Sequence, residues 1–111
     1  MAYDQELAGR IRGLLDDEAG VSEKKMFGGL AFLVGGNMAV VASGQGGVLV
    51  RVDPEESDEL VATTAADFME MRGRPMQGWL RVDGEAVGDP DELAGWVERG
   101  VAFARTLPAK D

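Results

Sequence analysis

The stretch that decides the fold runs from residue 38 to residue 52 and reads MAVVA-SGQGG-VLVRV. Its two β-branched runs are separated by a glycine cluster at residues 43–47. Another apolar run, residues 26–34, precedes them across the turn signal Gly-Gly-Asn at residues 35–37. Short β-branched runs divided by glycines are typical of antiparallel strands that follow one another in a meander. These residues therefore predict three consecutive strands.

Helix signals lie on both sides of this meander. Asp4 is suited to cap a first helix, whose apolar residues recur at i, i+4, i+7 and i+8. These residues are Leu7, Ile11, Leu14 and Leu15. The pairs Asp53-Pro54 and Asp89-Pro90 each place a capping acid before a proline, which suits the first position of a helix. The sequence therefore predicts one helix before the strands, one directly after them, and one near the C-terminus.

The segment between the second and third helices is harder to interpret. Residues 68–71 are consistent with a strand or an irregular edge, residues 73–78 have the glycines and proline of a loop, and residues 79–82 read as a strand. The predicted order is α-β-β-β-α-β-β-α. Strands in runs with helices between them favour an α+β fold, here a two-layer sandwich with helices on one face of an antiparallel sheet of about five strands.

Composition narrows the classes of function. The chain has 111 residues, which fits a single domain over residues 1–111, and it contains no cysteine and no histidine. Thiolate chemistry is excluded, and the commonest general base and metal ligand are missing. No apolar run of 18 residues exists, and the acidic N-terminus has no apolar signal core. We therefore expect a cytoplasmic protein that does not span a membrane, with no catalytic residue, no metal site and no cofactor.

Charge is segregated along the chain, whose net charge is −9. Residues 24–52 carry three basic residues and no acidic one, whereas residues 53–70 carry seven acidic residues and no basic one. Affinity for nucleic acid depends mainly on lysine and arginine contacts to phosphates. The acidic net charge therefore disfavours direct nucleic-acid binding, although local basic patches remain available to other partners.

Strand alternation points to one candidate interaction face. Leu49 and Arg51 point away from the valines of their strand, and Trp79 and Arg81 point away from the aliphatic residues of theirs. If the aliphatic sides meet the helices, the other sides form a helix-free face, which the neighbouring loop extends. The candidate face comprises Leu49, Arg51, Arg72, Arg74, Met76, Trp79 and Arg81. A surface that combines tryptophan, leucine, methionine and arginine is typical of interaction hot spots. The alternative is that the preceding loop covers the tryptophan and that acids of the helices pair with the arginines.

Several stretches together resemble the N-terminal domain of the TfoX family. They are residues 26–29 (MFGG) with 36–38 (GNM), residues 50–52 (VRV), residues 73–79 (GRPMQGW), and the closing Trp96-Val97 helix with Leu107-Pro108. The resemblance covers nearly the whole chain. It implies a two-layer fold similar to that of bacterial secretion chaperones. The family is named after a regulator of natural competence genes, which carries a second, C-terminal domain, and this sequence stops where that domain would begin.

Two other patterns have structural explanations. No Gly-Lys-Ser or Gly-Lys-Thr follows Gly28-Gly29, so these glycines favour a strand bend over a phosphate-binding loop. The acidic clusters at residues 16–18 and 53–59 lack the spacing of a calcium loop. Acids in the first turn of a helix are already stabilised by the helix dipole.

Three classes of function therefore stay open. The first is a non-enzymatic interaction or regulatory module, acting as a homodimer or with an acidic protein partner. The second is a domain that binds a small anionic ligand between Arg51, Arg74 and Arg81, with Trp79 stacked on it. The third, an enzyme limited to Arg, Asp, Glu, Ser or Tyr chemistry, is disfavoured by the absence of histidine, cysteine and a catalytic motif. The position of Tyr3, the sole tyrosine, at the terminus weakens it further.

Overall fold

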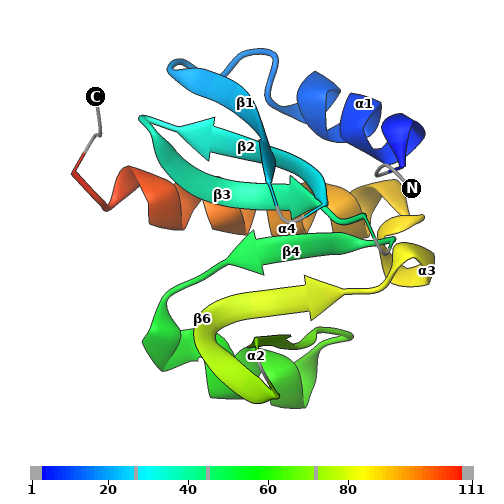
Figure 1. Ribbon diagram of the computed structural model, residues 1–111, viewed down its shortest axis with the longest axis vertical. Coiled ribbons are helices and arrows are strands. Elements are labelled where there is room, and N and C mark those ends of the chain that lie inside the picture. Colours follow the sequence, from blue (N-terminus) through cyan, green and yellow to red (C-terminus); the bar gives the residue numbers. More distant parts are fainter. Residues whose placement is uncertain (1–3, 27, 45, 72, 109–111) are drawn as a thin grey trace.

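One antiparallel sheet forms the centre of the computed structural model, which describes residues 4–26, 28–44, 46–71 and 73–108. In this part of the chain six strands lie in the order β1-β2-β3-β4-β6-β5 (Figure 1). They are β1 (Val21–Met26), β2 (Gly29–Val34), β3 (Asn37–Ala42), β4 (Val48–Arg51), β5 (Asp67–Met71) and β6 (Arg74–Val82). Each neighbouring pair is antiparallel. The predicted α+β class is confirmed.

The described residues form five helical segments, three of which begin at capping residues that the sequence predicts. They are α1 (Gln5–Leu14), the 3-10 turn η1 (Pro54–Glu56), α2 (Ser57–Thr63), α3 (Gly84–Val87) and α4 (Pro90–Arg105). The carboxylates of Asp4, Asp53 and Asp89 each accept a hydrogen bond from a backbone N–H of the first helical turn. Figure 1 shows α4 crossing one face of the sheet. The layered arrangement with helices on one face is therefore confirmed.

The main core lies between this face and the helices. On the sheet side, Val48, Val50, Leu80 and Val82 are fully buried. The helices contribute a stripe at helical spacing, which consists of Leu7 and Ile11 from α1 and Leu93, Trp96, Val97, Val101 and Ala104 from α4. Burying an aliphatic side chain of this kind contributes about 1.5–3 kcal/mol relative to leaving it exposed. The strand alternation that buries these residues also sets which side chains face the other way.

Three expectations about the element order are wrong. The sheet has six strands because residues 21–26 form β1, where Glu23, Lys24 and Lys25 are exposed. Such an edge strand needs no apolar alternation, and charged edge residues discourage pairing with other chains. Residues 84–87, where the predicted order contains no helix, form the short helix α3.

Residues 74–78 belong to β6 and not to a loop. The glycines and proline mark a bend inside the strand, where Gly78 has a φ of 87°. Its N–H donates to the buried Ser57 hydroxyl at 2.8 Å, and its carbonyl accepts from the N–H of Val52 at 2.9 Å. These two bonds tie the bend to η1, α2 and the end of β4. They also set the position of Trp79, the next residue.

Candidate interaction face

A row of paired residues crosses the whole sheet on the side away from the main core. From β1 to β5 its members are Lys24, Ala31, Val41, Leu49, Arg81 and Asp67. Directly paired residues of antiparallel strands project to the same face. The orientation of β1 is confirmed by its neighbour Glu23, whose carboxylate binds Arg12 of α1 at 2.6 Å on the opposite side. We call the surface around this row the helix-free face.

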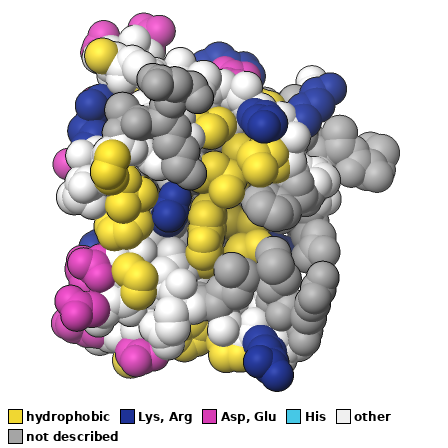
Figure 2. Space-filling view, turned by 60° about the vertical axis from the view of Figure 1, so that its left-hand side comes forward, with side chains coloured by type: hydrophobic (Ala, Val, Ile, Leu, Met, Phe, Trp, Pro, Cys, Tyr) yellow, Lys and Arg dark blue, Asp and Glu magenta, His cyan; other side chains and the backbone are white. Residues whose placement is uncertain are grey.

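The centre of the helix-free face is apolar. Ala31, Val41 and Leu49 are buried there in a small cluster of their own, separate from the main core. Around them pack large side chains that are only partly buried, namely Met26, Leu33, Met38, Met69 and Trp79. Figure 2 shows hydrophobic side chains gathered in the middle of the view, with basic side chains among and above them. This face therefore exposes an apolar area to solvent, and no helix of the described residues covers it.

Arg51 lies at one margin of the face, between two aromatic rings. It pairs with Trp79 across β4 and β6. Its guanidinium carbon is 5.8 Å from the centre of the Trp79 ring and 5.6 Å from that of Phe103 on α4. Both distances are within the range of cation–π attraction. The structure therefore anchors Arg51 between the sheet and α4, although strand alternation alone places it on an open face.

Phe103 was missed by the sequence interpretation. It follows Trp96 by seven residues, which is a helical spacing, so the stripe of α4 contained the signal.

Arg81 is also held in place. Its guanidinium donates to the hydroxyl of Ser43 at 3.4 Å and to the carbonyl of Gly46 at 3.2 Å, both in the connection between β3 and β4. Among the described residues, neither Arg81 nor Arg51 forms an ion pair. Their positive charges are therefore not neutralised by the acids of the helices.

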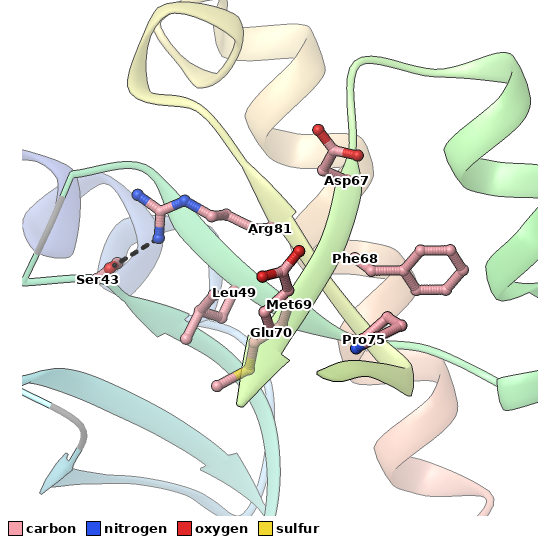
Figure 3. Close-up of a pocket in the computed structure, with 8 residues that line it drawn as sticks. All are labelled: Ser43, Leu49, Asp67, Phe68, Met69, Glu70, Pro75 and Arg81. Carbon is pink, nitrogen blue, oxygen red and sulfur yellow. Dashed lines mark hydrogen bonds between the residues drawn. The ribbon is translucent and has the colours of Figure 1, made fainter. Parts of the chain in front are cut away.

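A pocket of about 670 Å³ opens beside Arg81. Its lining includes Leu49, Met69 and two carboxylates of β5, Asp67 and Glu70. Figure 3 shows Met69 and the Glu70 carboxylate on the same side of β5 as Leu49 and Arg81, whereas Phe68 points away. Glu70 reaches this side because the pairing of β5 with β6 shifts register between Phe68 and Glu70. The pocket therefore combines apolar walls with charges of both signs.

The structure brings together only part of the predicted set. Leu49, Arg51, Trp79 and Arg81 share the helix-free face. Arg74 is exposed at the start of β6, where it pairs with the other end of β5. Arg72 and the side chain of Met76 lie outside the described residues. An anionic ligand held by three converging arginines gains no specific support from this arrangement, and that alternative stays a prediction.

Within residues 4–26, 28–44, 46–71 and 73–108, no three acidic side chains are grouped so that they could hold a metal ion. No helix in this part is long and apolar enough to cross a membrane.

The structure thus defines an α+β domain in which a single antiparallel sheet carries helices on one face and an apolar, partly basic surface on the other. The model of the TfoX N-terminal domain family matches residues 13–104 of this chain. This match begins within α1 and ends within α4, so it includes all six strands. The chain belongs to the TfoX N-terminal domain family. A comparison with curated proteins finds no match.

Proposed function

We propose that this domain is a non-enzymatic interaction module, regulatory or adaptor-like in role, that binds a partner protein through the helix-free face. The observation that carries this proposal is the set of five large, partly exposed apolar side chains around the buried trio of Ala31, Val41 and Leu49. An apolar area of this kind on one side of a small domain is typical of an interaction surface.

The residue types on the face support the same conclusion. Trp79 is half-buried and Arg51 lies over its ring, and tryptophan and arginine are enriched among residues that dominate binding energy. The methionines of the face, such as Met38, adapt readily to the shape of a partner. The hydrogen bonds of Arg81 and the ring contacts of Arg51 hold the basic groups in place before binding. Pre-organised side chains lose less conformational entropy when a partner binds.

The experiment is site-specific photo-crosslinking in cells that naturally make the protein. A photoreactive residue replaces Met38 on the helix-free face or, as a control, Leu14 on α1, whose side chain is 43% exposed. We expect a defined crosslinked product from position 38 and none from position 14. The product should disappear when Leu33→Glu places a charge on the same face. No product from position 38, or equal products from both positions, would refute the proposed function.

A further inference from the structure

We propose that the helix-free face binds a second copy of this chain, forming a twofold-symmetric dimer in which Lys24 of each copy enters the pocket beside Arg81 of the other. This inference rests on the proposed function and adds the identity of the partner and the register. It is carried by the order of charges along the cross-strand row.

The charges of the row are complementary to those of a second copy that runs in the opposite order. It starts at one edge of the sheet with Lys24, passes through three apolar residues, and ends at the other edge with Arg81 followed by Asp67. Consider a twofold axis that is parallel to the strands and passes between β3 and β4. Rotation about this axis places the row of one copy against the row of its partner in reverse order. Lys24 then faces the partner's Asp67, and Val41 faces the partner's Leu49. Opposite charges meet at both edges, apolar side chains meet in the centre, and Arg81 lies against the partner's Ala31, so no like charges meet along the row.

The other simple twofold arrangement is disfavoured. An axis along the row itself would place each residue against its own counterpart, so that Lys24 faces the partner's Lys24 and Arg81 faces the partner's Arg81. Like charges at an interface cost free energy and suppress that geometry. The charge pattern therefore selects the axis parallel to the strands.

The neighbouring residues match in the same arrangement. Next to the row, Ser22 pairs with Leu33, Leu33 with Met38, and Arg51 with Trp79. Reversal about the same axis places Leu33 against the partner's Trp79. It also places Met38 against the partner's Arg51, so no two basic side chains face each other here. Leu33 and Trp79, both partly exposed in the single chain, thereby cover each other.

The pocket receives the lysine. Asp67 and Glu70 both line it, and its walls include the apolar side chains of Leu49 and Met69 (Figure 3). A lysine can bury its methylene stem against such walls while its ammonium group reaches a carboxylate. The twofold axis delivers the partner's Lys24 to the edge of the sheet that carries this pocket. The mixed lining of the pocket thus fits a lysine side chain better than a free anion.

The size of the face sets the expected affinity. Six strands span about 24 Å, and five residues of strand span about 17 Å, so the face measures roughly 400 Å² in projection. Standard stable interfaces bury about 800 Å² on each partner. The dimer should accordingly be weak and reversible. Sedimentation velocity over the micromolar to millimolar range is therefore the suitable measurement.

The decisive experiment compares two charge reversals alone and mixed. In Lys24→Glu, acids face each other at both edges of the dimer, and in Asp67→Lys, bases do so. We expect each variant alone to raise the dissociation constant by about tenfold or more. In an equimolar mixture the two variants form a heterodimer with opposite charges at both edges. The mixture should recover a dissociation constant within about threefold of the wild type.

A matched control separates this register from a general charge effect. Lys25→Glu makes the same change one residue along β1, but Lys25 pairs with Leu30 of the main core and so lies on the other face. This variant should dimerise like the wild type. Circular dichroism of every variant confirms that the fold is intact. A dimer that resists both single reversals, or a mixture that fails to recover, would overturn the proposed register.

The outcomes also separate this inference from the proposed function. A chain that stays monomeric up to millimolar concentration, while position 38 crosslinks to a different protein, would overturn the dimer and leave the interaction face standing. A chain whose position 38 crosslinks to nothing would overturn both. A product of twice the chain mass, lost in Lys24→Glu and retained in Lys25→Glu, supports both.

Discussion

Substitution of Gly100 tests how closely α4 packs on the sheet. A Cβ atom at this position would lie 2.5 Å from the carbonyl oxygen of Ala39 and 3.4 Å from a methyl group of Val50. The first distance is about 1–1.5 Å shorter than an ordinary contact between nonbonded heavy atoms. In Gly100→Ala the helix must therefore move away from β3, which loosens the packing of Trp96 and Val97 on the same helix.

The change in the free energy of unfolding follows from two opposing effects. Overpacking of a core costs about 1–3 kcal/mol, whereas alanine stabilises a helix interior by about 1 kcal/mol relative to glycine. Gly95 on α4 isolates the second effect, because a Cβ there meets no atom within 4 Å. Gly95→Ala should therefore raise the free energy of unfolding by about 1 kcal/mol. Gly100→Ala should lie about 1–3 kcal/mol below Gly95→Ala.

Urea denaturation of the wild type and both variants measures these differences. The variants should share one denaturant slope, so that the change in midpoint reports stability alone. Thermal unfolding gives a second readout, at roughly 4 °C for each kcal/mol in a domain of this size. If Gly100→Ala is as stable as Gly95→Ala, α4 does not approach β3 this closely in solution, and the reasoning from the Gly100 contact is refuted.

Three further outcomes follow from single contacts. Ser57→Ala removes the acceptor of the buried N–H of Gly78 and should lower the free energy of unfolding by about 1–3 kcal/mol in urea denaturation, and an unchanged midpoint would contradict this. The hydrogen bond from Arg12 holds the pKa of Glu23 below its usual 4.5. The contribution of this pair to the free energy of unfolding is therefore present above pH 4.5 and is lost as the pH falls through the lowered pKa. Arg12→Ala should raise that pKa in an NMR titration, and a constant value would exclude the interaction. Phe103→Leu removes one of the two rings beside Arg51 and should increase the mobility of the Arg51 side chain, measured by NMR, with little loss of stability. Unchanged mobility would show that the Phe103 ring does not hold Arg51.

The sequence predicted those parts of the fold whose causes are local. The capping acids at Asp4, Asp53 and Asp89 act within one helical turn, and the glycine-divided runs at residues 26–52 are short-range signals. The strand β1 was missed because an edge strand needs no apolar pattern, and its residues are mostly polar. The bend in β6 was mistaken for a loop because its partners, Ser57 and Val52, are distant in sequence.

The candidate site shows the same division. Alternation correctly placed Leu49 and Trp79 on the helix-free face, since the strand period of two is a local property. It could not show that Arg51 lies over Phe103, because that contact depends on where the end of α4 packs against the sheet. The place of Lys24 on the helix-free face was also hidden, because it depends on β1 joining the sheet.

Local charge favours the helix-free face for the proposed contact between two copies of this strongly acidic chain. Two copies, each of net charge −9, repel on average, but over distances beyond about 8–10 Å salt screens exposed charges. The side chains that face each other then decide the geometry. On the helical side, the groove between η1 and α4 is lined by Asp53, Glu56 and Glu98 with a single base, Arg99. Approach by that side brings acid against acid. Approach by the helix-free face brings lysine against aspartate, and the apolar centre supplies the attraction that charge alone does not.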